Sequence, residues 1–235
     1  HPAVGEFLDH HELTYVIEKA RISHALCDLT LAEDMESARE RTSDICRELM
    51  FFSPLGDNPD GCTLDRAIQD KAADFAPCDT AADDTALIAF TSGTTGNPKA
   101  TMHFHRDVIA MCDCFPRYLD MAGPDDIFMG TPPLAFTFGL GGLTTFPMRH
   151  GASTRFFSGM LAPEQTLEAI QKYKITGLYT APTAYRIMAG LAAKFDLSSL
   201  NKCVSAGETL PKATWEAFHD ATGIRIVDGL GATEM

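Results

Sequence analysis

The chain has 235 residues, of which 45% are apolar, enough to bury the core of one large domain or two small ones. Its formal charge of −13, from 32 acidic and 19 basic side chains, argues against nucleic acid or an anionic membrane surface as a partner. Seven scattered cysteines favour reduced thiols in a cytoplasmic protein, and no apolar stretch approaches the length that would span a membrane.

Short apolar runs alternate with amphipathic stretches, which predicts an α/β fold with largely parallel sheets flanked by helices. Strands are expected at 22–27, 86–91, 127–131, 152–157, 175–180, 202–206 and 224–228. Helices are expected at 34–50, where apolar residues have helical spacing, and at 163–173 and 211–222, which each open with a proline. Residues 53–84 are rich in Pro, Gly, Asp and Asn and are expected to form a solvated connection.

The segment that leaves the expected strand 86–91 is dense in hydroxyl residues and glycine. It reads Thr91, Ser92, Gly93, Thr94, Thr95, Gly96, Asn97, Pro98, Lys99. Glycine lets backbone N–H groups approach an anion, hydroxyls donate hydrogen bonds and lysine supplies positive charge, so a polyphosphate is the predicted guest. The spacing is not that of a Walker A sequence, and no G-x-G-x-x-G dinucleotide fingerprint is present. A Walker-type ATPase or kinase is therefore disfavoured.

Three further segments, 133–139, 205–211 and 228–234, follow this loop in a fixed order. Together the four segments resemble those of the AMP-forming adenylate enzymes, the superfamily of acyl- and aryl-CoA synthetases, peptide-synthetase adenylation domains and luciferases. The residues at 132–142 and 228–235 are most similar to those of benzoate-CoA and 2-aminobenzoate-CoA ligases. The resemblance implies a ligase that uses ATP and Mg²⁺ to convert an aromatic acid to an acyl-adenylate and then transfers the acyl group to coenzyme A.

The resemblance also assigns a role to each segment. The phosphates of ATP would be held by Thr91, Ser92, Gly93, Thr94, Thr95, Gly96 and Lys99. Adenine would lie between two backbone segments, Ala206, Gly207 and Glu208 on one side and Asp228, Gly229, Leu230 and Gly231 on the other. The catalytic pair would be Thr233, at the α-phosphate, and Glu234, as the magnesium ligand. The acid would bind against Phe136, Thr137, Phe138 and Ala181, with 179–183 as a further wall.

Residues in two of these segments refine this expectation. Leu230 stands where many family members have an aromatic residue stacked on adenine, and leucine offers apolar contact without a ring. Phe136 and Phe138 on either side of Thr137 would leave a compact apolar slot that suits a flat ring. The Thr137 hydroxyl favours 2-aminobenzoate over benzoate because it can bond a ring amine, where the benzoate enzymes it resembles have alanine.

In the resembled family, further chain precedes this region, and a hinge and a small C-terminal domain with an essential lysine follow it. Residues 1–235 are therefore expected to be a truncated large N-terminal domain, with 1–84 as a lead-in segment and 85–235 as the motif-bearing core, and to be inactive alone. Three alternatives stay open: a fatty acyl-CoA synthetase, an adenylation domain that loads a carrier protein, and a nucleotide-binding module without turnover. The sequence leaves oligomeric state open.

Overall fold

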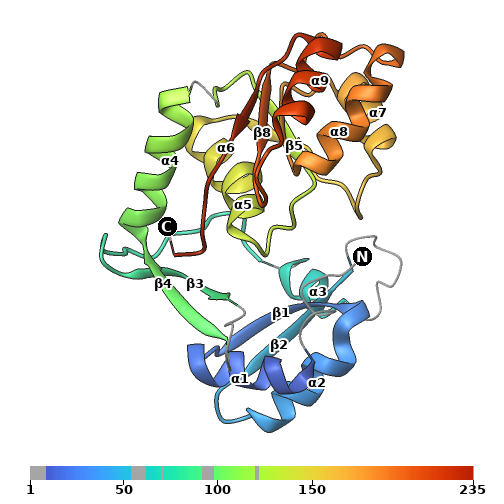
Figure 1. The fold of residues 1–235 in the computed structure, drawn as a ribbon. Helices are drawn as coiled ribbons and strands as arrows, with labels where there is room; N and C mark the ends of the chain where they lie inside the picture. Colours follow the sequence, from blue (N-terminus) through green and yellow to red (C-terminus); the bar gives the residue numbers. More distant parts are fainter. Residues whose placement is uncertain (1–8, 54–61, 70, 92–97, 120–121, 235) are drawn as a thin grey trace. The chain divides into compact units, whose positions relative to one another are not determined.

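The computed structural model describes residues 9–53, 62–69, 71–91, 98–119 and 122–234. The chain divides into two compact units, His1–His103 and Phe104–Met235. Each unit has its own sheet and its own buried core, and each is described separately below (Figure 1).

The His1–His103 unit is built on a parallel strand pair packed against two helices. Its elements are α1 (His10–Ala20), β1 (His24–Asp28), a 3-10 turn (Leu29–Leu31), α2 (Ala32–Arg41), β2 (Glu48–Phe52), α3 (Thr63–Gln69), β3 (Thr85–Thr91) and β4 (Lys99–Phe104). β1 pairs with β2 in parallel, and β3 and β4 form a separate two-stranded sheet. The core of this unit holds Ile17, Met35, Ala38, Ile45 and Cys46.

Local signals explain why α1 begins where it does. The Asp9 carboxylate accepts hydrogen bonds from the backbone N–H groups of His11 and Glu12, at 2.9 and 3.0 Å, and the Glu12 side chain reaches back to the Asp9 N–H. This reciprocal capping box satisfies donors that have no partner within the helix. The helix ends at Arg21, whose left-handed backbone (φ 55°) stops further helical bonding.

Two expectations about this unit are wrong. The helix expected at 34–50 ends at Arg41, and its last residues belong to β2 (Glu48–Phe52), because this segment with its apolar run 49–52 pairs with β1. Short apolar runs fit helix and strand periodicities equally well until a pairing partner is known. The connection expected at 53–84 contains α3, which is tied to β2 by a 2.8 Å hydrogen bond from the Phe51 N–H to Thr63 Oγ1.

The Phe104–Met235 unit holds a five-stranded sheet in the order β6-β5-β7-β8-β9, with every neighbouring pair parallel. Its strands are β5 (Ile127–Gly130), β6 (Ser153–Thr154), β7 (Gly177–Thr180), β8 (Lys202–Ser205) and β9 (Ile226–Asp228). The helical elements are α4 (His105–Leu119), α5 (Thr137–Leu140), a π-helical turn (Gly141–Thr145), α6 (Phe146–His150), α7 (Pro163–Tyr173), α8 (Pro182–Leu191), a 3-10 turn (Ala192–Lys194) and α9 (Lys212–Thr222).

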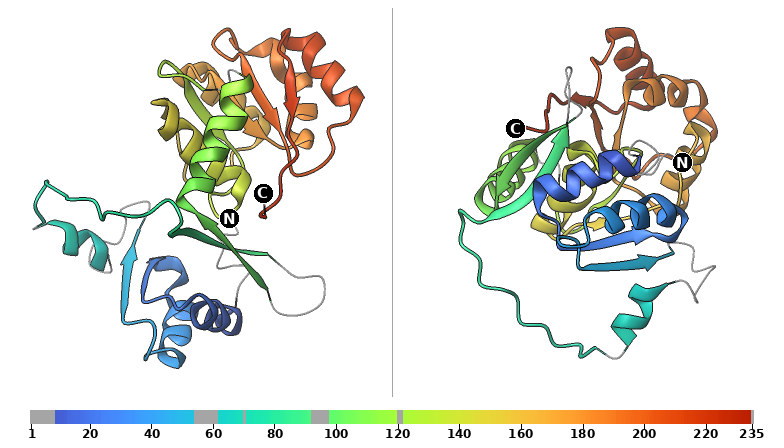
Figure 2. Two further views of the ribbon diagram at one scale, coloured as in Figure 1. Left: turned by 90° about the vertical axis from the view of Figure 1, so that its left-hand side faces the viewer. Right: turned by 90° about the horizontal axis from the view of Figure 1, so that it is seen from below.

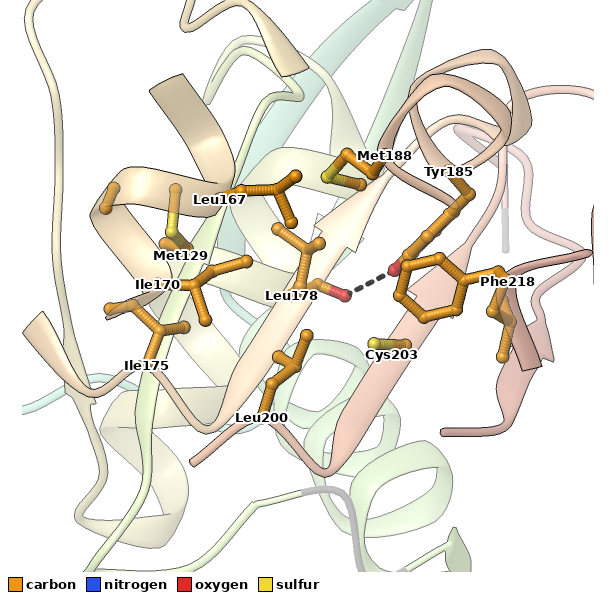
Figure 3. Close-up of a cluster of buried hydrophobic side chains, with 12 residues drawn as sticks. Met129, Leu167, Ile170, Ile175, Leu178, Tyr185, Met188, Leu200, Cys203 and Phe218 are labelled. Atoms are coloured by element: carbon orange, nitrogen blue, oxygen red, sulfur yellow. Dashed lines mark hydrogen bonds between the residues drawn. The ribbon is translucent and has the colours of Figure 1, made fainter. Parts of the chain in front are cut away.

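Both faces of this sheet are covered, because successive side chains of a strand point to opposite faces. Leu178 and Cys203 face a core formed with α7, α8 and α9, whereas Tyr179 and Val204 face a second core formed with α4 and α6. Figures 1 and 2 show α4 (green) on one side of the sheet and α7 to α9 (orange to red) on the other. In the first core the Tyr185 hydroxyl donates to the carbonyl oxygen of Leu178 (Figure 3).

The α/β class with parallel sheets flanked by helices is confirmed. The expected helix 163–173 is confirmed with both ends, and 211–222 begins one residue late because Pro211 is the N-cap. The strands expected at 127–131, 175–180, 202–206 and 224–228 are confirmed but shorter, and that at 152–157 shrinks to Ser153–Thr154. No helix in the described part of the chain is long and apolar enough to cross a membrane.

Candidate active site

A cavity of about 290 Å³ lies in the Phe104–Met235 unit, at the carboxyl ends of β7, β8 and β9. Ligands of parallel α/β sheets bind at this edge, where the loops that leave the strands converge. The cavity is lined by Met111, Phe115, Thr137, Phe138, Phe146, Tyr179, Val204, Ala206, Gly207, Gly229, Leu230, Gly231 and Ala232. The lining joins residues of three separate sequence motifs with side chains from α4 and from two strands.

One wall of the cavity is aromatic. The Phe138 ring lies 5.8 Å from the Tyr179 ring, and the Phe115 ring stacks at the same centroid distance on Phe146. Tyr179 and Phe146 are buried, and they belong to the core between the sheet and α4. Since these rings are held by packing, the wall is a preformed apolar surface of the kind that binds flat, apolar groups.

A second part of the lining is backbone from the loops that follow β8 and β9. Ser205 and Asp228 are register partners at the ends of these strands, and the Gly229 N–H donates to the Ser205 carbonyl at 2.7 Å. Gly207 has φ 93°, which an L side chain rarely adopts, so glycine is required to turn the loop here. Ala206 and Gly229 present little side-chain bulk, so a planar group could lie against the peptide planes.

The cavity has little polarity and no charge of its own. Among the lining residues only Thr137 and Tyr179 have hydrogen-bonding side chains. The Tyr179 hydroxyl is buried and lacks a hydrogen-bond partner. Burial, reinforced by the negative charge of Asp126, raises the pKa of Tyr179, so the phenol stays neutral. The cavity therefore suits uncharged rings, and anionic groups would have to lie outside it.

Seven of the residues expected at a binding site line this one cavity. They are Thr137, Phe138, Ala206, Gly207, Gly229, Leu230 and Gly231. Leu230 has 95% of its surface exposed, so its side chain borders the opening and does not fill the interior.

Other expected residues do not line it. Phe136 is the N-cap of α5 and is 57% exposed, and Ala181 is the N-cap of α8. Glu208 and Asp228 are exposed, and one carboxylate oxygen of Glu208 accepts a 3.0 Å hydrogen bond from Thr183 Oγ1 at the start of α8. The structure thus gives Glu208 a partner that the sequence did not suggest.

The expected phosphate and metal residues are described only in part. Thr233 is half-buried and Glu234 is exposed, just beyond the lining residue Ala232. Thr91 ends β3 and the exposed Lys99 begins β4, while Ser92, Gly93, Thr94, Thr95 and Gly96 lie outside the described residues. Among the residues that are described, no three His, Cys, Asp or Glu side chains gather as a metal-binding group. The exposed Glu234 carboxylate is an oxygen ligand of the type Mg²⁺ prefers, and Mg²⁺ commonly takes only one or two carboxylates from a protein.

Four lining residues that lie outside the expected segments were missed from the sequence: Met111, Phe115, Phe146 and Val204. Met111 and Phe115 are four residues apart on α4 and so share one helical face, which is ordinary core spacing. Val204 shares a sheet face with Tyr179, and Phe146 follows a glycine-rich stretch. None of these positions differs in sequence from a packing residue, so only the tertiary structure could reveal them.

Comparison with known proteins gives the family. The family model described as AMP-binding enzyme matches residues 3–235. The chain belongs to the AMP-binding enzyme family. The match covers nearly the whole chain, and it includes every residue of the cavity.

Two relatives and one solved structure illustrate how similar this chain is to other proteins of the family. The chain is 31% identical over 234 residues to an uncharacterized acyl-CoA ligase, YtcI, of Bacillus subtilis, covering 98% of this chain and 43% of the relative. It is 31% identical over 166 residues to benzoate-CoA ligase of Thauera aromatica, covering 68% and 31%. The crystal structure of anthranilate CoA ligase AuaEII with anthranoyl-AMP superposes with TM-score 0.83 at 29% identity, covering 97% and 44%. The chain thus spans less than half the length of these relatives.

Proposed function

We propose that this chain forms the nucleotide- and acid-binding part of an AMP-forming aryl-CoA ligase. The observation that carries the proposal is the shared cavity, which is lined by residues of three motifs, represented by Phe138, Gly207 and Gly229. In the proposed reaction a carboxylate oxygen of the acid attacks the α-phosphorus of ATP and pyrophosphate leaves. The thiolate of coenzyme A then attacks the acyl carbon and AMP leaves.

In this scheme the chain's own residues bind and orient. The aromatic ring would lie against Phe138 with Thr137 at its edge, and adenine against the backbone of 206–207 and 229–231, since both surfaces are uncharged. Glu208 and Asp228 would border the adenine from outside the cavity. Phe136 and Ala181 would border the acid. Because both reactants are anionic, the barrier is dominated by charge repulsion and positioning, and no protein nucleophile is needed.

The charged end of ATP would be held outside the cavity. Thr91, Ser92, Gly93, Thr94, Thr95, Gly96 and Lys99 would bind its β- and γ-phosphates. Thr233 would donate to the α-phosphate and Glu234 would hold Mg²⁺, which when bound neutralises phosphate charge. With a net charge of −13, the chain offers little long-range attraction for ATP, so these local cations and donors must supply it.

We propose 2-aminobenzoate or benzoate as the acid. The acid would share with adenine a cavity of only about 290 Å³ that is apolar on most of its surface, which favours a single ring over a long alkyl chain. Thr137 is half-buried on the lining, where its hydroxyl could accept a hydrogen bond from an ortho amine. A relative named benzoate-CoA ligase and a neighbour that holds anthranoyl-AMP support this class of acid.

The test is carboxylate-dependent exchange of pyrophosphate into ATP by the full-length protein, with benzoate, 2-aminobenzoate and a fatty acid. We expect exchange with one or both aromatic acids and little with the fatty acid. Thr137→Val keeps the shape of the side chain. It is expected to raise the KM for 2-aminobenzoate about tenfold relative to the KM for benzoate, because a buried amine would lose its hydrogen-bond acceptor. Absence of exchange with every acid would refute the proposal.

The same assay separates the remaining possibilities. Release of AMP with transfer to free coenzyme A would distinguish a CoA ligase from an adenylation domain that loads a carrier protein. Exchange with the fatty acid alone would indicate a fatty acyl-CoA synthetase. We expect residues 1–235 alone to form no adenylate. The exposed Cys78 and Cys114 are free thiols, which suits the reducing cytoplasm that we propose as the protein's location.

A further inference from the structure

Residues 137–150 form one continuous helical stretch that contributes three side chains to the cavity. Thr137 and Phe138 come from α5 at the start, and Phe146 comes from the first position of α6. Between them lies the π-helical turn Gly141–Thr145. Single π turns are rare in proteins, and they occur frequently at functional sites.

The π turn changes which side chains share a face. The Phe146 N–H donates to the Gly141 carbonyl, five residues earlier, in place of the α-helical partner four residues earlier. In an uninterrupted α-helix, positions 138 and 146 would lie about 80° apart around the axis; the extra residue makes them equivalent to positions seven apart, reducing this to about 20°. Both rings can then contribute to one aromatic wall.

Gly142 allows the π turn to lie against the sheet. A Cβ built at this position would be 2.5 Å from Cδ1 of Tyr179 and 2.7 Å from its Cε1, closer than real Cβ atoms come. Tyr179 cannot easily give way, because its buried ring is 5.8 Å from the rings of both Phe128 and Phe138. The turn therefore sits directly on a ring of the cavity wall, and glycine is the residue that fits.

A second glycine of the turn supports the other end of the wall. A Cβ on Gly141 would be 3.2 Å from Cζ of Phe146, a tight contact that this ring would have to yield to. The turn also leaves the Thr144 hydroxyl buried without a hydrogen-bond partner, which is unfavourable for stability. The π turn thus contacts two rings of the cavity, those of Tyr179 and Phe146, in spite of the cost of burying the Thr144 hydroxyl. Its position allows it to set the geometry of the site.

We propose that the π turn Gly141–Thr145 sets the shape of the acid-binding wall, and that Gly142 is its principal positioning residue. This inference rests on the proposed function, because it assigns the aromatic wall to the acid and not to the nucleotide. Gly142 itself is not among the residues that line the cavity. It acts through Tyr179 and Phe138, and Gly141 acts through Phe146.

The test compares three glycine-to-alanine variants of the full-length protein. Gly142→Ala is expected to raise the KM for the aromatic acid at least about tenfold, since overpacking displaces rings that cannot relax. The KM for ATP should stay within about twofold, because the backbone wall of 206–207 and 229 is not touched. Gly141→Ala makes a milder contact, 3.2 Å from one ring, and should fold normally and raise the acid KM about threefold.

Gly190→Ala is the matched control. Gly190 lies within α8, and a Cβ there would meet nothing within 4 Å. This variant should leave both KM values unchanged and be slightly more stable, because alanine is the better helix former. Equal rises in the acid and ATP KM values in the Gly142 or Gly141 variant, or no change in either value in both variants, would overturn the inference.

A binding measurement separates this inference from the proposed function. Titration of the intrinsic fluorescence of 2-aminobenzoate reports occupancy of the cavity without turnover. A wild-type protein that binds the acid but catalyses no exchange would refute the proposed ligase activity, while the role of the π turn could still be tested by binding. Weaker acid binding by the Gly142 and Gly141 variants, but not by the Gly190 variant, would then support the inference. A wild-type protein that neither binds nor exchanges any aromatic acid would overturn both.

Discussion

Two buried tyrosines make opposite use of their hydroxyl groups. The Tyr185 hydroxyl donates to the carbonyl oxygen of Leu178 at 3.0 Å (Figure 3). It also lies 3.1 Å from the carbonyl oxygen of Val204, so it joins α8 to two strands of the sheet. The Tyr179 hydroxyl has no hydrogen-bond partner. We therefore expect Tyr185→Phe to lower the free energy of unfolding by about 1–2 kcal/mol, and Tyr179→Phe to leave it unchanged or raise it. Urea denaturation measures both, and equal losses in the two variants would contradict this account.

Asp196 gives the Phe104–Met235 unit a stability that depends on pH. Its carboxylate accepts a 2.8 Å hydrogen bond from Lys174 Nζ and another from the Ser198 N–H. The Lys174 ammonium, followed by Ser198, lowers the pKa of Asp196 below its ordinary value of 3.8. A lowered folded-state pKa means that the stabilisation is complete above pH 3.8 and is lost as the pH falls toward the folded-state value.

Asp196→Asn should therefore be less stable than wild type at neutral pH, with the difference disappearing in acid. The measurement is the midpoint of urea unfolding between about pH 6 and pH 2.5. Lys174→Met removes the partner and should show the same convergence. A difference between wild type and Asp196→Asn that stays constant across this range would exclude the ion pair as its cause.

At the scale of elements, the amino ends of three neighbouring strands are tied by one polar network. Lys202 Nζ on β8 lies 2.9 Å from Asp126 Oδ1, and Thr176 Oγ1 donates to the same oxygen at 2.8 Å. The Ile127 N–H of β5 donates in turn to Thr176 Oγ1. Asp126 keeps only 10% and Lys202 19% of their side-chain surface exposed, so solvent replaces little of this network if one member is lost.

Lys202→Met is expected to lower the free energy of unfolding by about 2–3 kcal/mol, because it leaves a buried carboxylate without its cation. Adding Asp126→Asn should recover much of the loss, since asparagine still accepts from Thr176 but carries no charge. Thermal and urea unfolding of the single and double variants measure the coupling. A double variant whose loss equals the sum of the single losses would show that the ion pair contributes nothing.

At the scale of the whole molecule, the Phe104–Met235 unit has a complete core of its own. Its parallel sheet is covered on both faces by two clusters of buried side chains. The single tryptophan of the chain, Trp215, belongs to this unit, and its Nε1–H donates to the Ile226 carbonyl at 3.0 Å. Tryptophan fluorescence therefore reports on this unit alone.

We expect residues 104–235, expressed alone, to fold and to show a cooperative unfolding transition in Trp215 fluorescence. The reason is that parallel sheets are stable when both faces are buried, which this unit achieves with its own helices. The measurement is urea denaturation followed by fluorescence and by near-ultraviolet circular dichroism. A fragment without near-ultraviolet signal or cooperative unfolding would show that this unit needs the rest of the chain to fold.

The sequence by itself determined the fold class, most strands of the large sheet and the motifs of the site. These features are local: apolar runs such as 175–180 record burial on both faces, a proline begins α7, and glycines such as Gly207 record a backbone turn. Such features can be predicted from the sequence, because the local structure requires one type of residue at a given position.

Only the tertiary structure decided which distant residues pair with or contact these local features. The helix expected at 34–50 became in part a strand because β1 offered a pairing partner, and α3 formed where composition suggested a loop. Met111, Phe115 and Val204 joined the cavity because packing between α4 and the sheet placed them there. The role of Gly142 depends on the ring of Tyr179, far away in sequence. Contacts between distant residues are set by how elements pack, and no local pattern of residues encodes them.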